Sequence, residues 1–257
     1  MKSNMEKEIG WLLQEKYGGK MTGAAKKDIE RLKAGEPLDH IIGYVEFLDC
    51  KILASKDALI PRVETEYWVG EAIREIKGKG GKVKVLDMFA GSGCIGISIV
   101  RHFDRLSAGR FKNVHVVFAD SEKPALKQIE KNCTLNKIPK SAYQMIQSDI
   151  FLNIRGKYDY IFANPPYIPT VRKFKIQTSV LKYEPHTALF GGENGLLYIR
   201  KFLAEAKNFL NKKGHIYMEF DSPQKKQIEA LLKKYGYASW EFHKDQYSKW
   251  RWLVVNN

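Results

Sequence analysis

Short apolar segments alternate with amphipathic segments from residue 83 to the end of the chain. The apolar segments have the length and composition of buried strands. Strands are predicted at residues 83–87, 114–120, 143–149, 158–163, 215–221, 240–243 and 251–255. Helices are predicted at residues 94–101, 124–136, 194–210 and 224–235, and Gly214 is predicted to close the third. Repeated strand–helix units predict an α/β fold with a doubly wound, seven-stranded and mostly parallel sheet.

The first 80 residues have a different pattern. Residues 1–35 predict one or two short helices, residues 36–53 a small hairpin that turns near Gly43, and residues 58–66 the start of a helix at Pro61. Glu64 and Glu66 suit the N-terminus of that helix, and we expect them to stabilise it rather than to act in catalysis. The glycine- and lysine-rich residues 78–84 predict a linker. The chain is therefore divided into residues 1–80 and 81–257.

Composition narrows the possible partners and locations. A net charge of +14 raises the expectation of a polyanionic partner such as RNA or the ribosome, although scattered lysines fit a generally basic surface equally well. The sequence lacks a run of about 18 apolar residues, which excludes a membrane-spanning helix. A polar N-terminus predicts a cytoplasmic, or at least intracellular, protein, and an organelle is not excluded. Cys50, Cys94 and Cys133 form no CxxC pair, so we expect reduced structural thiols and no metal site.

The segment from Tyr158 to Tyr167 predicts a functional corner. An apolar strand breaks abruptly at Asn164, Pro165, Pro166 and Tyr167. The prolines restrict the backbone and donate no hydrogen bonds. The carbonyl groups of Asn164 and Pro165 therefore point in fixed directions and are free to accept hydrogen bonds. The Asn164 side chain adds an acceptor and two donors, and Tyr167 adds a flat apolar wall. This corner suits a planar NH2 group, whereas the simpler alternative is a rigid turn leaving the sheet.

Polar residues follow four of the predicted strands. The first strand is followed by the turn from Asp87 to Gly93. Asp120, Asp149 and Asn164 come at the ends of the second, third and fourth strands. In a doubly wound sheet the carboxyl ends of the strands form the ligand site, and a carboxylate there can accept both hydroxyls of a ribose. The set therefore predicts a nucleoside pocket, although a tight turn with three unrelated carboxylates would give the same pattern. Neither the dinucleotide GxGxxG turn nor a GxxxxGK[ST] phosphate loop is present.

The order of these elements and the turn from Asp87 to Gly93 resemble class I S-adenosylmethionine-dependent methyltransferases, which have a Rossmann-like fold. Asn164-Pro-Pro-Tyr167 resembles the corner of their amino-group-modifying members. Three segments together resemble the peptide chain release factor glutamine methyltransferases: Leu59-Ile-Pro-Arg62-x-Glu64-Thr-Glu66, Asn164-Pro-Pro-Tyr-Ile168 and Tyr183-Glu-Pro-x-x-Ala-Leu-x-Gly-Gly-x-x-Gly195. The chain departs from that family at Val63, where a proline is usual, and in a shorter N-terminal helical part.

The resemblance implies a role for each segment. It implies S-adenosylmethionine as the cofactor, no metal, and a release factor as the substrate, docked by residues 1–80. The cofactor would meet Asp87, Phe89, Ala90, Gly91, Ser92, Gly93, Asp120, Asp149, Ile150 and Asn164, with Asp120 at the ribose and with Asp149 and Ile150 beside the adenine. The glutamine amide would be held by Asn164, Pro165, Pro166 and Tyr167.

Other functions fit the same corner. An amino methyltransferase acting on adenine or guanine in RNA or DNA would use it in the same way, and the basic charge favours that alternative. A glutamine of a ribosomal protein is a related substrate. A binding module that keeps the fold without catalysis is a third alternative. His186 lies near the site in sequence and could be a base, but we expect a histidine of a surface loop.

Overall fold

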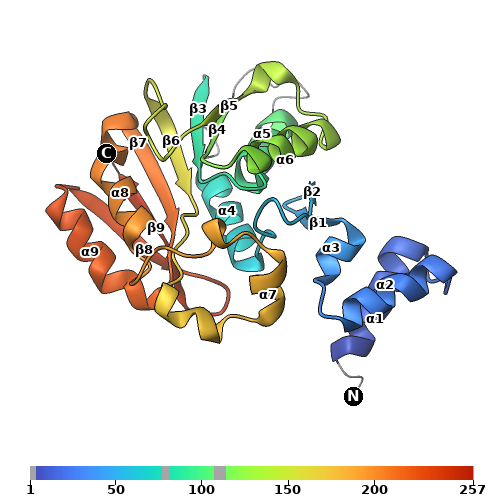
Figure 1. Cartoon of the computed structure of the whole chain (residues 1–257). Coiled ribbons are helices and arrows are strands. Elements are labelled where there is room, and N and C mark those ends of the chain that lie inside the picture. Colours follow the sequence, from blue (N-terminus) through green and yellow to red (C-terminus); the bar gives the residue numbers. More distant parts are fainter. Residues whose placement is uncertain (1–3, 77–81, 107–113, 257) are drawn as a thin grey trace.

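The computed structural model describes residues 4–76, 82–106 and 114–256. Within them, seven strands form one sheet in the order β5-β4-β3-β6-β7-β9-β8 (Figure 1). The strands are β3 (Val83–Met88), β4 (Val114–Asp120), β5 (Tyr143–Gln147), β6 (Tyr158–Ala163), β7 (Leu210–Glu219), β8 (Ser239–Lys244) and β9 (Trp250–Asn256). Strands β3 to β7 pair in parallel, whereas β9 pairs antiparallel with both β7 and β8. The predicted fold class is confirmed.

The strand order reverses between β3 and β6. From β3 the chain moves outward through β4 to β5, and from β6 it moves in the opposite direction to β7. Strands β3 and β6 lie side by side, with Met88 paired to Ala163 at their carboxyl ends. Connections leave these two ends in opposite directions, which opens a crevice there, and ligands bind at such a switch point in open α/β sheets.

Helices cover both faces of the sheet (Figure 1). Helices α4 (Val63–Ile76), α5 (Cys94–Leu106) and α6 (Lys123–Leu135) lie on one face, and α8 (Leu197–Glu205) and α9 (Lys225–Lys234) lie on the other. Each face has its own apolar cluster, and strands buried on both sides explain the nearly continuous apolar runs of the sequence.

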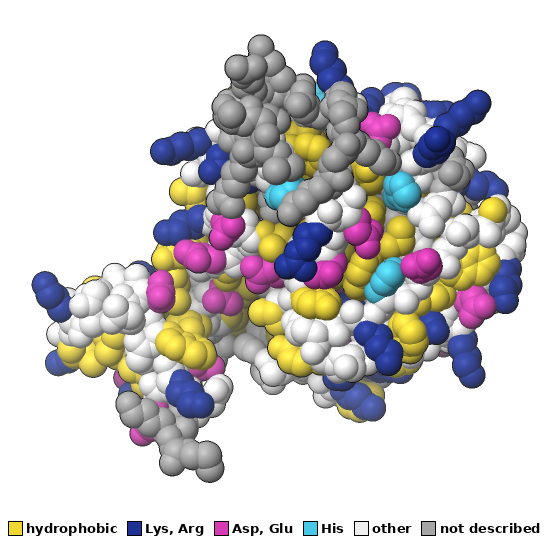
Figure 2. Space-filling view, turned by 180° about the vertical axis from the view of Figure 1, so that it is seen from behind, with side chains coloured by type: hydrophobic (Ala, Val, Ile, Leu, Met, Phe, Trp, Pro, Cys, Tyr) yellow, Lys and Arg dark blue, Asp and Glu magenta, His cyan; other side chains and the backbone are white. Residues whose placement is uncertain are grey.

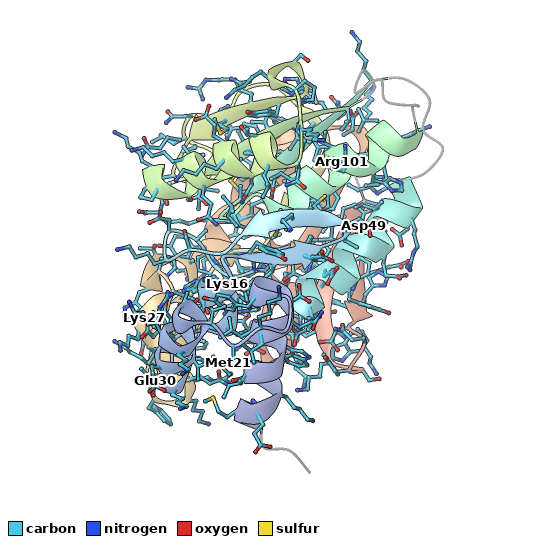
Figure 3. The ribbon with its side chains drawn as sticks, turned by 90° about the vertical axis from the view of Figure 1, so that its right-hand side faces the viewer. Lys16, Met21, Lys27, Glu30, Asp49 and Arg101 are labelled. Carbon is cyan, nitrogen blue, oxygen red and sulfur yellow. The ribbon has the colours of Figure 1, made fainter. Side chains whose placement is uncertain are left out.

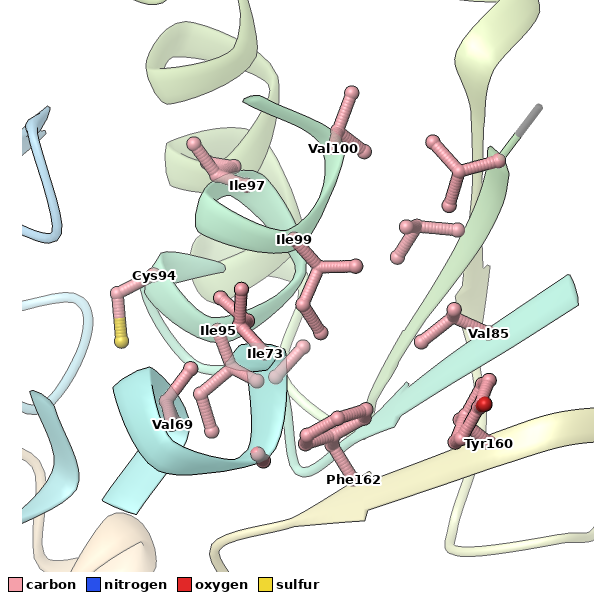
Figure 4. Packing of buried hydrophobic residues seen from close by; sticks show 14 of the residues in the cluster. Val69, Ile73, Val85, Cys94, Ile95, Ile97, Ile99, Val100, Tyr160 and Phe162 are labelled. Atoms are coloured by element: carbon pink, nitrogen blue, oxygen red, sulfur yellow. The ribbon is translucent and has the colours of Figure 1, made fainter. Parts of the chain in front are cut away.

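Helices α4 and α5 pack closely on the strands (Figure 4). Val69 of α4 and Ile95 of α5 belong to the same buried cluster as Phe162 of β6. Gly96 lets α5 approach the sheet, because a Cβ atom at this position would lie 2.3 Å from the ring of Phe118. The tight packing holds the N-terminus of α5, and the turn before it, in a fixed position at the end of β3.

The N-terminal part has a small core of its own. Helices α1 (Asn4–Tyr17), α2 (Gly23–Lys33) and α3 (Leu38–Ile42) bury Leu12, Ile29, Leu32 and Ile41. Figure 3 shows Lys16, Met21, Lys27 and Glu30 on this part, with the hairpin of β1 (Tyr44–Phe47) and β2 (Cys50–Leu53) between it and the sheet helices. The division at residue 80 stays a prediction: residues 77–81, which include most of the predicted linker, lie outside the described residues, and α4 belongs to the core of the sheet.

Two sequence predictions about residues 36–66 are wrong. The hairpin turns at Leu48 and Asp49, both with positive φ, and not near Gly43. Gly43, with φ of 98°, ends the short helix α3, a position where glycine is favoured because it has no Cβ atom. The next helix begins at Val63, not at Pro61. Pro61 lies in the segment without regular secondary structure that precedes that helix.

Three further boundaries of strands and helices differ from the prediction. The helix predicted to Leu210 ends at Glu205 and is followed by a 3-10 turn over Ala206–Phe209. Strand β7 already begins at Leu210, so Gly214 lies inside a strand and closes no helix. A Cβ atom at Gly214 would lie 2.9 Å from a backbone oxygen, so the glycine serves close packing. The third predicted strand ends at Gln147, two residues before Asp149.

Candidate active site

Two cavities lie at the carboxyl edge of the sheet, and Asn164 lines both of them. The first encloses about 1030 Å³ of space, counted with the solvent at its mouth, and is bordered by the ends of β3, β4 and β6. The second encloses about 920 Å³ and lies on the side of Tyr167 and Ile168. Leu59, Arg62 and Ala188 also line both. The corner after β6 therefore forms part of the wall between two separate binding spaces.

The turn after β3 shapes the floor of the first cavity. Phe89 and Gly91 both have positive φ, of 58° and 53°, which turns the backbone sharply and exposes it to the cavity. The N–H of Ala90 donates to the carbonyl oxygen of Ala119 (3.1 Å) and ties the turn to β4. The lining contains the four predicted residues Phe89, Ala90, Gly91 and Ser92.

Asp120 lies at the end of β4 and lines the first cavity. One oxygen of its carboxylate accepts from the N–H of Gly91 (2.8 Å) and the other from the N–H of Glu122 (2.9 Å). Burial raises the pKa of Asp120, whereas these backbone N–H groups oppose that rise. The two N–H groups hold the carboxylate in place. Each of its oxygens has a further lone pair, so the group can still accept hydrogen bonds from the hydroxyl groups of a ligand.

Asp87 lies beneath the turn. Its side chain is buried, and one carboxylate oxygen accepts from the N–H of Gly96 (2.9 Å) at the start of α5. The other oxygen has no hydrogen-bond partner among the described residues. Burial raises the pKa of Asp87 to about 8. Neither Asp87 nor Gly93 is among the described residues that line the cavity, so both support the turn from below.

Asp149 and Ile150 lie in the turn after β5 and line the first cavity. Asp149 is exposed at the edge, whereas Ile150 is buried and has a positive φ of 51°. The Ser148 hydroxyl donates to the carbonyl oxygen of Ile150 (2.7 Å) and accepts from the N–H of Asn153 (3.0 Å), which stabilises this tight turn. The turn places an apolar side chain next to a carboxylate, a combination that suits a flat heterocycle carrying an amino group.

Hydrogen bonds hold the corner after β6 at both ends. Asn164 Nδ2 lies 3.3 Å from Thr65 Oγ1 on α4. The Tyr167 hydroxyl donates to Glu219 Oε1 (2.8 Å) at the end of β7, and Gln224 Nε2 donates to the carbonyl oxygen of Tyr167 (2.9 Å). Pro166 lines the first cavity and Pro165 the second, so the corner passes between the two spaces.

The glycines of the third segment allow it to pack against this corner. A Cβ atom at Gly191 would lie 2.3 Å from the carbonyl oxygen of Pro166, and one at Gly195 would lie 2.1 Å from that of Tyr167. The N–H of Ile168 donates to the carbonyl oxygen of Leu189 (3.0 Å), and the N–H of Gly191 donates to that of Ile168 (2.9 Å). The spacing of the glycines therefore follows from the shape of the corner.

An ion pair joins the first and third segments. Arg62 Nη2 lies 2.7 and 2.9 Å from the two carboxylate oxygens of Glu184, which also accepts from the N–H of Ile60 (3.1 Å). The Glu184 side chain is 1% exposed, so removal of Arg62 would leave a buried charge with only one hydrogen bond from a backbone N–H. Three segments that are far apart in the sequence thus meet around one corner.

Comparison with known proteins identifies the family. Residues 73–193 match the family model of the methyltransferase small domain. The release factor glutamine methyltransferase of Francisella tularensis is 37% identical over 84% of this chain and 73% of its own length. That of Lactococcus lactis is 32% identical over 96% of this chain and 88% of its own length. This chain belongs to the release factor glutamine methyltransferases.

Solved structures resemble this family member in fold alone. A ribosomal protein L11 methylase from Lactobacillus delbrueckii subsp. bulgaricus has a TM-score of 0.52 at 18% identity, over 77% of this chain and 79% of that chain. A second structure, solved in complex with SAH, has a TM-score of 0.54 at 14% identity, over 83% of this chain and 55% of that chain. Both share the fold described for this release factor glutamine methyltransferase.

Sequence reasoning missed two polar residues of this release factor glutamine methyltransferase. Thr65 lies between the two glutamates of the first segment, and its hydroxyl donates to Glu219 Oε2 (2.7 Å). Glu219 is buried, also accepts from Trp68 Nε1 (2.7 Å), and has a pKa raised by burial. A signal was present, because Glu219 lies at the carboxyl end of the fifth parallel strand. The prediction extended that strand to Asp221, which hid the position.

Other expectations concern glutamates, a histidine, cysteines and possible metal or membrane features outside the corner after β6. Glu66 accepts from the N–H of Leu48 (2.9 Å), so it holds the hairpin turn, while Glu64 lies in the first turn of α4. His186 is exposed and does not line either cavity among the described residues. The three cysteines are free and buried, as predicted. In the described ranges, no group of three or more histidine, cysteine and acidic side chains could hold a metal ion, and no helix is long and apolar enough to cross a membrane.

Proposed function

We propose that this protein transfers the methyl group of S-adenosylmethionine to the side-chain amide nitrogen of a glutamine in a peptide chain release factor. The observation that carries the proposal is the position of Asn164, which lines both cavities at the end of β6. A methyl donor in one cavity and an acceptor nitrogen in the other would meet at this side chain. Membership of the family supports the choice of glutamine as the acceptor.

The first cavity fits S-adenosylmethionine. Asp120 would accept the ribose hydroxyls, because its carboxylate is already oriented by two backbone N–H groups. Ile150 would cover one face of the adenine, and Asp149 would accept a hydrogen bond from the amino group of the adenine. The backbone of residues 89–92 would border the methionine part. When bound, the cofactor supplies a methyl group on a positively charged sulfur, which is a good leaving group.

The second cavity fits a glutamine side chain. An amide nitrogen is a weak nucleophile because its lone pair is delocalised, so its orientation matters most. Asn164 Oδ1 and the Pro165 carbonyl would accept its two N–H groups and direct the nitrogen towards the first cavity. Apolar residues would surround its methylene groups, among them Ile168, Ile176 and Leu189. Catalysis would come from positioning and electrostatics, with no covalent enzyme intermediate. The amide nitrogen would release one of its two protons to solvent water as it takes the methyl group.

A direct test offers the protein two substrate classes at once. Methyl-labelled S-adenosylmethionine is incubated with the wild-type protein, a purified release factor and total RNA. The proposal expects label on a glutamine of the release factor and none in RNA. Label in RNA alone would support the base methyltransferase, and label on neither would contradict both. Neither the base alternative nor a ribosomal-protein glutamine is favoured, because the curated relatives with high similarity are named for release factors.

We further propose that residues 1–80 dock the release factor and that the protein acts in the cytoplasm, where translation takes place. A contact between the basic surface and the ribosome or RNA is part of this proposal. Lys and Arg side chains are spread over the face seen in Figure 2 and do not gather in one patch. Binding to a stop-codon ribosome complex should therefore weaken with rising salt, and binding that ignores salt would contradict an electrostatic contact.

A further inference from the structure

The hydroxyl of Thr65 connects the buried carboxylate of Glu219 to the amide of Asn164. Its Oγ1 lies 2.7 Å from Glu219 Oε2 and 3.3 Å from Asn164 Nδ2. Thr65 and Glu219 are almost completely buried, with exposed fractions of 3% and 1%. The three residues belong to α4, to the end of β7 and to the corner after β6. A short chain of hydrogen bonds therefore ends at the group that borders both cavities.

With Glu219 ionised, the direction of each hydrogen bond in this chain is determined by chemistry. Burial raises the pKa of Glu219, but the hydrogen bonds from Thr65, Trp68 and Tyr167 favour its charged form. An ionised carboxylate can only accept, and an indole N–H can only donate. Glu219 Oε2 accepts from Trp68 Nε1 (2.7 Å), and its other oxygen accepts from the Tyr167 hydroxyl (2.8 Å). The Thr65 hydroxyl must therefore donate its one hydrogen to Glu219, and its oxygen then has only lone pairs to offer to Asn164.

This direction selects one orientation of the Asn164 amide. A lone pair on Thr65 Oγ1 attracts the NH2 end of the amide and repels its oxygen. The amide oxygen is then turned away from Thr65 and is left for a ligand. If the amide were flipped, two acceptors would face each other across 3.3 Å, and an NH2 group would point at the ligand instead.

We propose that Glu219 and Thr65 are positioning residues that hold the Asn164 amide with its oxygen towards the substrate, so that the site accepts a glutamine amide and rejects a glutamate carboxylate. This inference rests on the proposed function. A glutamine NH2 group donates to the exposed oxygen, whereas a carboxylate, which can only accept, is repelled by it. A buried polar group that cannot be satisfied is a strong source of discrimination.

The test replaces the Thr65 hydroxyl without changing the shape of the side chain. Thr65→Val removes the acceptor for Asn164, and Thr65→Ser keeps it. Thr134→Val is a matched control, because Thr134 lies exposed on α6 and its hydroxyl bonds only locally to the Glu130 carbonyl (3.0 Å). Methyl transfer to a release factor is followed as kcat and KM, cofactor binding as the Kd of S-adenosylmethionine, and stability as Tm.

For Thr65→Val we expect kcat to fall about 100-fold, as for other losses of substrate alignment, with an unchanged Kd for the cofactor. Thr65→Ser should keep most of the wild-type kcat, and Thr134→Val should keep all of it. Equal loss in Thr65→Val and Thr65→Ser would overturn the proposal, because side-chain shape and not the hydroxyl would then matter. A wild-type kcat in Thr65→Val would overturn it as well.

A competition experiment gives a readout that a purely structural role of Thr65 would not change. A release factor with its glutamine replaced by glutamate should inhibit the wild-type protein only weakly, through its contact with residues 1–80. It should inhibit Thr65→Val more strongly, because a flipped Asn164 amide donates to a carboxylate. Equal inhibition of both proteins would contradict the orientation. If the wild type methylates no release factor, the proposed function fails and this inference fails with it, whereas an active wild type with an equally active Thr65→Val overturns this inference alone.

Discussion

The two cavities on either side of Asn164 are built in different ways. The first is formed largely by turns that directly follow β3, β4 and β5, so Asp120 and Asp149 lie next to the strands that position them. Other segments add a few polar side chains to its lining, among them Asp57, Thr65 and Thr187. The second depends on side chains from segments more than a hundred residues apart, joined by pairs such as Arg62 with Glu184. Local backbone geometry therefore determines one binding space, and long-range side-chain contacts determine the other.

This difference explains which mutations should affect only one cavity. A change in a strand-end turn should act on the cofactor alone. A change in the long-range pairs should act mainly on the release factor and on stability. Only Asn164, with Leu59, Arg62 and Ala188, lines both among the described residues, so its substitution tests the boundary between them.

Substitution of Asn164 should have the largest effect. In Asn164→Ala the amide oxygen that would bind the substrate is lost, and we expect methyl transfer to fall about 1000-fold. The Kd of S-adenosylmethionine, measured by calorimetry, should change little, because Asp120, Asp149 and Ile150 would supply the contacts to its ribose and adenine. Thr134→Val on α6 is a suitable control, since this exposed side chain bonds locally to the Glu130 carbonyl. An active Asn164→Ala protein would remove the basis for assigning the corner to catalysis.

Substitution of Asp120 should affect the first cavity and leave the second unchanged. Hydrogen bonds to a charged group contribute roughly 1.5–3 kcal/mol, which corresponds to a rise of about 10- to 100-fold in the Kd of S-adenosylmethionine for Asp120→Ala. The KM for the release factor at saturating cofactor should stay near the wild-type value. Asp120→Asn keeps one acceptor oxygen and should lie in between. A raised KM for the release factor with an unchanged cofactor Kd would reverse the assignment of the two cavities.

Substitution of Arg62 should destabilise the protein because the buried carboxylate of Glu184 loses its ion pair. In Arg62→Ala the Glu184 carboxylate keeps only the N–H of Ile60, so we expect the free energy of unfolding to fall by about 3 kcal/mol and KM for the release factor to rise. Arg74→Ala is the control, because the Arg74–Glu71 pair is largely exposed and should contribute less than about 1 kcal/mol. Urea denaturation measures the free energy of unfolding of the two variants. Equal losses in Arg62→Ala and Arg74→Ala would show that the Arg62–Glu184 pair stabilises the protein no more than a surface pair does.

Asp87 should give the smallest effect, visible mainly as a pH dependence of stability. Its pKa of about 8 in the folded state lies above the ordinary 3.8, so the folded state holds a proton that the unfolded state has lost. Stability from this group is complete below pH 4 and decreases as pH rises towards 8. Asp87→Asn cannot ionise, so its free energy of unfolding should decrease less than that of the wild type between pH 4 and pH 9. Denaturation across this pH range with no difference between the two proteins would contradict the shift.

Asp87→Asn also shows whether Asp87 supports the turn after β3 or contacts the cofactor directly. Because Asp87 lies beneath the turn and bonds to the N–H of Gly96, we expect only a small change in the Kd of S-adenosylmethionine. A loss as large as that of Asp120→Ala would instead indicate a direct contact with the cofactor, as the family resemblance implies.

The sequence predicted the first cavity better than the second for a physical reason. Strand periodicity, glycine turns and acids at strand ends are local signals, so the positions of Gly91, Asp120 and Ile150 follow from the order of elements. The contacts of Glu219 and Glu184 depend on which segments meet in space. No local pattern predicts that Thr65 and Glu219, 154 positions apart, share a hydrogen bond.

Boundary errors had a similar origin. Gly43 and Gly214 were both interpreted as local signals, one for a hairpin turn and one for a helix end. Gly43 does adopt a positive φ, but it ends α3, while the hairpin turn uses Leu48 and Asp49. Gly214 packs closely against backbone, because a Cβ atom there would lie 2.9 Å from the Asn211 carbonyl oxygen of its own strand and 3.2 Å from that of Asp159 on β6. A glycine signals a special backbone or a close approach, and tertiary structure decides which of the two applies.

The most direct test of the account is a crystal structure of the protein with SAH and a glutamine-bearing release factor. The account predicts SAH in the first cavity, with Asp120 at its ribose, and the glutamine side chain in the second. The amide nitrogen should lie about 2.9 Å from both Asn164 Oδ1 and the Pro165 carbonyl oxygen. A glutamine bound outside the second cavity, or an Asn164 amide with its NH2 group towards the substrate, would contradict it.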